Sequence, residues 1–253
     1  MRVAFVGKGG AGKSSLAGTF VRVLAGTGER VLALDSDPMP GLAVSLGVRQ
    51  SDAGLPDEAV EAFDDEDGHT RYRLRAGLSG TDAVEQYAVR TAEGAHFLQL
   101  GKAHGPTWSN TRQHFGFQRL LDDLPGDGWS IVGDLPGGTR QPFLTWARYA
   151  QTFLVVVEPT AASLLTGRRL AKLAQGAGSP RVLAVANKVR EPGDAHRVAE
   201  RTGLRVLGSV PFDPVQGEAD RHGRAVLDHD PHAATVTAVR SLVDALRSEK
   251  EPA

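Results

Sequence analysis

The stretch that decides the fold of this chain is Gly7-Lys8-Gly9-Gly10-Ala11-Gly12-Lys13-Ser14. It follows a short apolar run, Val3–Val6, and precedes a stretch with helical character, Ser15–Leu24. A strand, a glycine-rich loop and a helix in this order, with G-x-x-x-x-G-K-[ST] in the loop, are typical of a phosphate-binding P-loop. Glycines let backbone N–H groups approach phosphate oxygens, and the N-terminus of the helix favours an anion.

Two side chains of this loop have predicted tasks. Lys13 would reach the β- and γ-phosphates, and the Ser14 hydroxyl would ligate Mg²⁺. A glycine turn that binds nothing and a dinucleotide fingerprint are the alternatives, because the loop also satisfies G-x-G-x-x-G. Lys13-Ser14 at the helix start favours a triphosphate site over a pyrophosphate site. The residues predicted to bind the nucleotide here are Gly9, Gly10, Ala11, Gly12, Lys13, Ser14 and Ser15.

The composition excludes several classes of protein. With 253 residues the chain suffices for one large α/β domain or two small ones, and its net charge of −1 gives no overall field that would recruit nucleic acid or an anionic membrane. The absence of cysteine excludes disulfides, thiolate metal sites and a cysteine-held iron–sulfur cluster. Met1 leads directly into a strand, and no apolar run approaches the ~18–20 residues that span a bilayer. We therefore expect a cytoplasmic protein without a signal peptide.

The pattern of apolar runs predicts the fold class. Most predicted strands are continuous apolar runs, which indicates burial on both faces. We predict an α/β fold, a mainly parallel doubly wound sheet flanked by helices, forming one domain over 1–253 with a variable insertion around 49–95. Within it, residues 49–70 are expected to be a solvated loop. Further strands are predicted at 30–35, 72–74, 96–100, 129–134, 152–157, 181–186 and 205–210, and helices at 41–46, 82–93, 113–124, 162–173 and 233–247.

One residue of the loop carries a resemblance to a known family. Lys8 precedes Gly9-Gly10-Ala11-Gly12-Lys13-Ser14, and this arrangement resembles the deviant P-loop of the MinD/nitrogenase-iron-protein class of dimeric nucleotide switches. In that class the early lysine reaches across a dimer to the partner's nucleotide. The resemblance implies that Lys8 acts in trans, as an arginine finger does, in a nucleotide-bridged homodimer. A solvated surface lysine is the alternative interpretation.

Acidic residues follow two predicted strands, and ligands of open α/β sheets bind beyond the carboxyl ends of strands. Asp35-Ser36-Asp37-Pro38 resembles switch I of the same class. This implies that Asp37 holds or activates the attacking water and that Asp35 supports Mg²⁺ or the loop. For both residues, an acidic helix cap or turn is the alternative.

The second acidic strand end is Asp134-Leu135-Pro136-Gly137-Gly138, which resembles Walker B running into switch II. The resemblance implies that Asp134 ligates Mg²⁺ through water and that the N–H of Gly137 or Gly138 senses the γ-phosphate. Glycine suits this task because the backbone must approach the phosphate and then move away. A plain strand-to-turn junction is the alternative.

The base-binding side of the site is predicted further along the chain. Asn187-Lys188 resembles the N-K element that reads the nucleotide base in P-loop proteins. Position 190 is Arg190 rather than the aspartate that favours guanine, so adenine, and hence ATP, is expected. Pro211 and Phe212 would flank the base.

Over nearly the whole chain the resemblance is closest to the carbon monoxide dehydrogenase maturation ATPases of the CooC type. In these proteins a C-x-C pair binds nickel between two subunits, in a loop that corresponds to the segment from Leu100 to Leu121 here. Because this chain has no cysteine, the resemblance implies the ATPase switch and the dimer but not the nickel site. His96, His104 and His114 flank this segment, but their spacing matches no local chelate. The 101–115 loop, with Trp108, is instead a candidate docking site for an unknown client protein.

Two surfaces bear on other partners. The C-terminal helix could pack in the core or bind a membrane, but it lacks the bulky apolar residues and the cationic face of a membrane helix. Nucleic-acid binding is not expected, although Arg168, Arg169 and Lys172 form a local basic patch. The sequence thus predicts a Mg²⁺-dependent ATPase, a homodimeric switch for maturation, assembly or positioning of a client. The alternative is a non-catalytic, ATP-dependent scaffold or a positioning protein that binds DNA or membrane.

Overall fold

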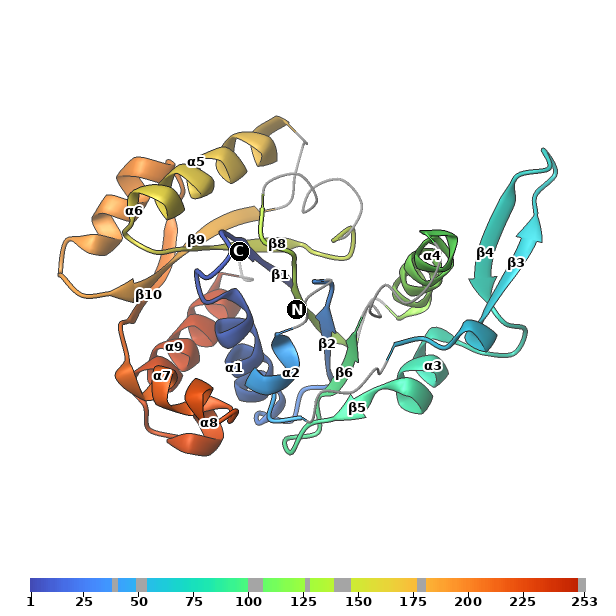
Figure 1. The fold of residues 1–253 in the computed structure, drawn as a ribbon, viewed down its shortest axis with the longest axis horizontal. Helices are drawn as coiled ribbons and strands as arrows, with labels where there is room; N and C mark the ends of the chain where they lie inside the picture. The colour runs from blue at the N-terminus through green and yellow to red at the C-terminus, as the bar shows by residue number, and fades with distance from the viewer. Residues whose placement is uncertain are drawn as a thin grey trace.

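The computed structural model describes residues 1–37, 41–48, 54–99, 107–125, 128–138, 147–176 and 181–249; of residues 107–113 it describes the backbone alone. Its centre is an eight-stranded sheet with the order β10-β9-β8-β1-β7-β2-β6-β5, covered by helices on both faces (Figure 1). Neighbouring strands are parallel except for β5 and β6. The predicted mainly parallel, doubly wound sheet is confirmed.

The elements follow one another as strand and helix along most of the chain. The strands of the large sheet are β1 (Arg2–Gly7), β2 (Val31–Asp35), β5 (Val89–Arg90), β6 (His96–Gln99), β7 (Ser130–Asp134), β8 (Thr152–Val157), β9 (Arg181–Val189) and β10 (Val206–Pro211), and β3 (Val60–Asp64) pairs with β4 (Thr70–Leu74) in a separate hairpin. The helices are α1 (Lys13–Ala25), α2 (Leu42–Ser45), α3 (Gly80–Tyr87), α4 (Thr107–Asp123), α5 (Ala161–Gly176), α6 (Asp194–Thr202), α7 (Pro214–Arg221), α8 (Val226–His229) and α9 (Ala234–Ser248), with a short 3₁₀ turn at Asp57–Ala59.

The sheet separates two apolar layers. On one face α1 and α9 pack against the strands, and the ring of Phe20 meets that of Phe5 edge to face at a centroid distance of 5.5 Å. On the other face α3, α4, α5 and α6 cover the strands. All six residues of β8 are buried, as its continuous apolar sequence predicts for a central strand. Because the central strands are parallel, their carboxyl ends lie at the same edge of the sheet, where β1 leads into the P-loop.

The predicted solvated loop over residues 49–70 is wrong in its second half. β3 and β4 form an antiparallel hairpin that projects beyond α4 (Figure 1). Val60 is buried against Gly116 of α4, and the ring of Tyr72 stacks on that of Phe115 at 5.6 Å. Because only alternate residues of these short strands face α4, their apolar signal is weak, and the acidic run at 64–67 reads as a solvated loop.

Two predicted helices have different bounds in the structure. The helix predicted at 82–93 is α3, which begins at Gly80 after the Ser79 cap and ends at Tyr87, because Ala88 turns into extended backbone and leads to β5. The helix predicted at 113–124 is α4, which already begins at Thr107. Tertiary packing of α4 on the hairpin and on α3 therefore prevails over the weak helix propensity of residues 107–110. Three helices, α6, α7 and α8, lie in segments for which the sequence predicted none.

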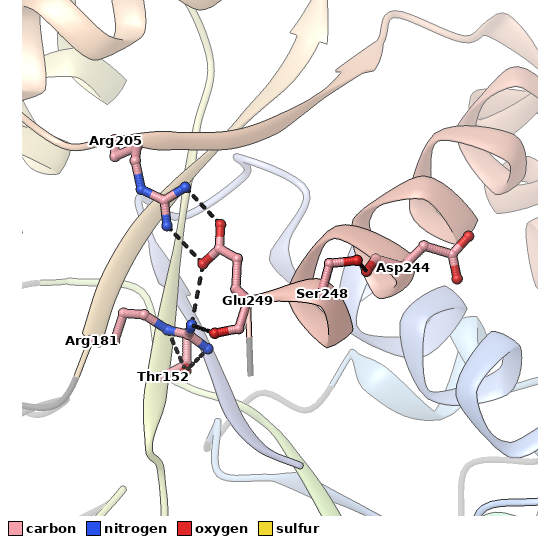
Figure 2. Close-up of polar contacts among 6 residues, drawn as sticks. All are labelled: Thr152, Arg181, Arg205, Asp244, Ser248 and Glu249. Carbon is pink, nitrogen blue, oxygen red and sulfur yellow. Dashed lines mark hydrogen bonds and ion pairs between the residues drawn. The ribbon is translucent and has the colours of Figure 1, made fainter. Parts of the chain in front are cut away.

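The C-terminal helix α9 packs in the core, as the first of the two interpretations expects. Its apolar stripe is buried, and residue 249 directly after the helix fixes its end: the Glu249 carboxylate accepts hydrogen bonds from Arg205 and Arg181 (Figure 2). Arg181 in turn donates to Thr152 of β8. The buried stripe consists of Val236, Val239, Leu242, Val243 and Leu246. The helix therefore does not present this face to a membrane.

Candidate nucleotide-binding site

The P-loop backbone depends on glycine at two positions. Gly10 and Gly12 have φ angles of 81° and 91°, in the left-handed region that other residues rarely adopt. A Cβ at Gly12 would also lie 2.4 Å from Nδ2 of Asn187. Gly12 directly precedes α1, so its conformation turns the loop into the helix and points the first N–H groups of the helix at the loop's hollow.

The predicted base-reading pair contacts the P-loop. Nδ2 of Asn187 donates to the carbonyl of Ala11 at 2.7 Å, and Nζ of Lys188 donates to the carbonyl of Gly10 at 2.9 Å. Lys188 also pairs with Glu158 at 2.5 Å and has a left-handed φ of 56°. One N–H of the Asn187 amide is therefore engaged with the loop, and the reading of the base by this residue stays a prediction.

Glu158 is a site residue to which the sequence assigned no role. It directly follows β8, and its backbone N–H donates to the Ser163 hydroxyl at 3.0 Å, while its carboxylate reaches Lys188. The signal that could have found it is its place at the carboxyl end of the strand beside β1. The carboxyl ends of β8 and β9 are thereby joined to the loop between β1 and α1.

Ser14 and Asp134 meet at the start of α1. The Ser14 hydroxyl donates to Oδ2 of Asp134 at 2.5 Å, whereas Oδ1 of Asp134 is buried and has no hydrogen-bond partner among the described residues. Burial raises the pKa of Asp134 to about 7, and the nearby Asp35 carboxylate adds to the increase. A buried carboxylate oxygen without a partner is unfavourable, so this position favours a cation.

Asp35 supports the switch I loop, which is one of the two roles predicted for it. It lies opposite Asp134 in the register of β2 and β7, is fully buried, and accepts backbone N–H bonds from Asp37, Gly41 and Leu42. Burial raises its pKa to about 6, and these three bonds oppose the increase. Both of its oxygens thus bind the switch I backbone, and its ligation of Mg²⁺ stays a prediction. Asp37 is half-buried beside it, and its role toward water is untested.

The described part of switch II touches the P-loop. The N–H of Gly138 donates to the carbonyl of Gly7 at 3.3 Å. A Cβ on Gly137 would lie 3.1 Å from the backbone nitrogen of Gly9 and 3.8 Å from Nζ of Lys13. Gly137 is therefore close to the residue expected to bind the terminal phosphates, and a larger residue at this position would crowd the loop.

A pocket of about 600 Å³ extends from the P-loop to the end of β10. Pro211 and Phe212, predicted to flank the base, line it, and the guanidinium of Arg190 lies 3.5 Å from the centroid of the Phe212 ring. Asp213 shapes the same wall, since its carboxylate accepts the N–H of Val215 on α7 and that of Thr235 on α9. Other lining residues are Gly10, Gly12, Lys13, Ser14, Ser15, Asn187, Lys188 and Gln216.

Lys8 and Lys13 differ in their surroundings. Lys13 is only 6% exposed, at the first position of α1. Lys8 is exposed, and its Nζ donates to the carbonyl of the neighbouring Gly9 at 3.1 Å. The two lysines of the motif are thus distinct: one lies inside the site of its own chain, and the other is available to a second molecule.

Among the described residues, His96 and His114 belong to no group of side chains placed to hold a metal ion. His96 is buried on β6 with Nε2 3.3 Å from Glu85, and His114 lies on α4 beside Gln118. His104 lies outside the described residues, as does the side chain of Trp108. Residues 107–115 belong to α4 rather than to a loop, and the docking of a client protein at 101–115 stays a prediction.

The family of the chain follows from comparison with known proteins. Residues 3–226 match the model described as the CobQ/CobB/MinD/ParA nucleotide binding domain. This chain belongs to that family. The carbon monoxide dehydrogenase accessory protein CooC of Rhodospirillum rubrum is 29% identical over 248 residues, covering 91% of each chain. The resemblance stated from the P-loop and its neighbouring motifs is confirmed at the level of this family.

Solved structures of MinD share the fold. The Mg-ADP complex of MinD from Pyrococcus horikoshii OT3 aligns with a TM-score of 0.73 at 18% identity, over 98% of this chain and 96% of that one. The cell division ATPase MinD of Pyrococcus furiosus gives 0.71 at 19% identity, over 98% and 99%. Within the described residues, this family member has no helix that is long and apolar enough to cross a membrane.

Proposed function

We propose that this protein is a Mg²⁺-dependent ATPase that acts as a nucleotide-switched homodimer and drives the maturation, assembly or positioning of a client protein. The observation that carries the proposal is the contact of Ser14 with Asp134 beside the P-loop, which leaves one buried carboxylate oxygen of Asp134 without a partner among the described residues. A hydroxyl and a carboxylate form the oxygen donor set that Mg²⁺ takes at triphosphate sites. The Mg-ADP complex of the related MinD fold agrees with this choice of ligand.

The residues divide the work of the site. The Ser14 hydroxyl donates a hydrogen bond to Asp134 and keeps its lone pairs for a metal, and Oδ1 of Asp134 has no partner among the described residues. Ser14 and Asp134 would hold Mg²⁺, which would neutralise the charge of the phosphates. Lys13 and the loop N–H groups bind the β- and γ-phosphates, and Asp37 of switch I orients the water that attacks the γ-phosphorus, giving ADP and phosphate.

Lys8 completes the site of a second protomer. Its exposure within the P-loop supports this role, because a cation that served its own nucleotide would lie inside the loop as Lys13 does. Changing Lys8→Ala should leave ATP binding within about threefold and lower hydrolysis by about 10³-fold, since a trans cation contributes 10³–10⁵ in rate. Measured rates of phosphate release and calorimetric affinities check both numbers.

The control is Lys172→Ala, which removes an exposed lysine from α5. This variant should keep the ATP affinity and the hydrolysis rate of the unchanged protein. Equal hydrolysis by Lys8→Ala and the unchanged protein would rule out the trans lysine, and loss of ATP binding in Lys8→Ala would place the residue in its own site instead.

The client is proposed from the relatives. CooC is by name an accessory protein of another enzyme, which supports a role in maturation. A scaffold without turnover is the second candidate, and one observation favours it. Gly138 already bonds to Gly7 and Gly137 packs on Gly9, so the described part of switch II rests on the P-loop. Phosphate release that stays at the buffer rate despite tight ATP binding would establish the scaffold and exclude the ATPase.

A further inference from the structure

The short helix α2 lies beside α1, the helix that follows the P-loop (Figure 1). A Cβ at Gly18 of α1 would lie only 2.4 Å from Cβ of Ser45 and 2.8 Å from its carbonyl carbon, closer than non-bonded carbon atoms can approach. Leu42, Ala43 and Leu46 are buried in the same apolar layer as α1. Gly18 therefore allows the two helices to pack with their backbones close together, and this packing fixes the position of α2.

A buried arginine supports the chain directly after α2. Arg22, on α1, is 3% exposed, and its guanidinium pairs with Glu93 at 2.5 Å and with Asp228 of α8 at 2.7 Å. Gly47 has a left-handed φ of 69°, and a Cβ there would lie 2.6 Å from Oδ2 of Asp228 and 3.2 Å from Nη1 of Arg22. Because a buried ion pair is costly to break, this cluster is a second fixed contact for α2.

The N-terminal end of α2 reaches the candidate metal site. A Cβ at Gly41, which precedes α2, would lie 3.4 Å from Oγ of Ser14, in van der Waals contact. Oδ2 of Asp35 accepts the N–H groups of Gly41 and Leu42, at 3.1 and 3.0 Å. Ser14 itself donates to Asp134, which lies opposite Asp35 in the register of β7 and β2. The start of α2 therefore belongs to the same contact network as the residues proposed to hold Mg²⁺.

We infer that α2 is the positioning element of the metal site, and that Gly18 is the residue that lets α2 take its position. Because α2 is fixed at Gly18 and at Gly47, it holds Gly41 against the side chain of Ser14. That side chain, in contact with both Gly41 and Asp134, is thereby confined to the rotamer that bonds to Asp134. This inference rests on the proposed function, because it assumes that Mg²⁺ and a nucleotide occupy the site.

The position of α2 separates the binding of the metal from the binding of the nucleotide. The nucleotide pocket is lined by the P-loop, the start of α1, the end of β9 and the residues around α7, and among the described residues α2 contributes none. A displaced α2 should therefore leave the contacts of the nucleotide in place and loosen Ser14. Groups that orient a metal ligand typically contribute about 10–100-fold to metal affinity. We expect a loss of Mg²⁺ affinity at nearly constant nucleotide affinity.

The test is Gly18→Ala, whose methyl group must push α2 away from α1. Calorimetric titration with ADP, once with Mg²⁺ and once with EDTA, gives two affinities, and their ratio measures the coupling between metal and nucleotide. The unchanged protein should bind ADP at least about tenfold more tightly with Mg²⁺, because the cation neutralises phosphate charge. Gly18→Ala should lower this ratio about tenfold and change the ADP affinity in EDTA by less than about threefold.

A second variant acts on the other fixed contact of α2. In Gly47→Ala the methyl group would press on the Asp228 carboxylate, and the ratio should fall in the same direction. Gly193→Ala is the control, because Gly193 has a φ of −85° and a Cβ there would have no described atom within 4 Å. The control should keep the ratio of the unchanged protein. Circular dichroism identifies the folded variants, and if one of the two test variants is unfolded, the other decides.

Three outcomes separate the inference from the proposed function. A folded Gly18→Ala or Gly47→Ala variant that keeps the original ratio overturns the inference and leaves the proposed function intact. An equal loss of ADP affinity in Mg²⁺ and in EDTA also overturns the inference, because α2 would then support the P-loop as a whole. Equal ADP affinities of the unchanged protein with Mg²⁺ and with EDTA contradict the Mg²⁺ site of the proposed function, and the inference with it.

Discussion

At the scale of single residues, the two buried aspartates of the site differ in their free hydrogen-bonding groups. Asp35 accepts three backbone N–H bonds from switch I, while Asp134 accepts one hydroxyl and keeps Oδ1 free. Burial raises the pKa values of both carboxyl groups, and a neighbouring carboxylate adds to each increase, Asp37 for Asp35 and Asp35 for Asp134. A divalent cation would relieve this repulsion, so its binding follows from the electrostatics of the loop as well as from the motif.

His96 gives a pH-dependent prediction. Burial lowers its pKa below the ordinary 6.5, although Glu85 near Nε2 opposes this. Since the folded pKa lies below the unfolded one, the unfolded chain takes up the proton first. The stability that neutral His96 contributes is therefore present above about pH 6.5 and is lost as the pH falls toward the lowered folded pKa.

The variant His96→Gln carries no titrating group at this position. Its melting temperature should lie below that of the unchanged, nucleotide-free protein at pH 7.5, because the contact of the ring with Trp129 is lost, and the gap should narrow at pH 5.5. His196→Gln, at an exposed position of α6, should show the same small gap at both pH values. A gap for His96→Gln that widens at pH 5.5 would contradict the argument.

The predictable site residues are those whose role depends on local sequence. Lys13 and Ser14 lie in a motif, and Asp134 ends an apolar strand, so their place beside the phosphates follows from the order of elements. The role of Glu158 depends instead on a distant partner. Glu158 pairs with Lys188, 30 positions later. No pattern in one sequence reports such contacts.

At the scale of elements, the end of α9 gives the next prediction. Glu249 receives two hydrogen bonds of 2.6 Å from Arg205 and one of 3.2 Å from Arg181 (Figure 2). These bonds join the last helix to β9 and β10. Because the geometry is bidentate with Arg205, Glu249→Gln should cost about 1 kcal/mol, at the upper end for exposed ion pairs, and lower the melting temperature by about 2–4 °C.

The loss should shrink in 1 M NaCl, where charges at the surface are screened within about 3 Å. Glu200→Gln is the matched control: Glu200 is exposed on α6, and the described residues form no ion pair with it. Nucleotide affinity should be unchanged in both variants, because Thr152 and Arg181 begin their strands and the P-loop lies past the opposite ends. A melting temperature equal to that of the unchanged protein would show that packing of the apolar stripe alone fixes α9.

The elements also show where the fold could be predicted. β1, β2, β7 and β8 are continuous apolar runs, and their order beside the P-loop leads to the observed sheet. The hairpin of β3 and β4 could not be found this way. The face of the hairpin opposite α4 carries charged residues, and its apolar face is buried only because α4 lies against it. The charged residues of the two strands on that face are Glu61, Arg71 and Arg73.

At the scale of the whole molecule, the trans role proposed for the exposed lysine of the P-loop requires a second copy of the chain. Lys8 lies at the carboxyl edge of the sheet, near Gly9 and the glycines of switch II, and is exposed in one chain. A site that needs the partner's lysine is complete only in the dimer, so nucleotide and dimer formation should be coupled. The γ-phosphate is the group that distinguishes the two states, since switch II contacts the loop near Lys13.

We therefore expect the mass in solution, measured by light scattering with Mg²⁺, to depend on the nucleotide. With ADP the protein should have the mass of one 26.8 kDa chain, and with a non-hydrolysable ATP analogue that of two. Lys8→Ala should bind the analogue and remain monomeric, because it lacks the cation that offsets the charge of two facing triphosphates. A dimer with ADP, or a dimer of Lys8→Ala with the analogue, would mean that surfaces other than the nucleotide and Lys8 join the chains, and the switch would then lie in a change of shape within a constant dimer.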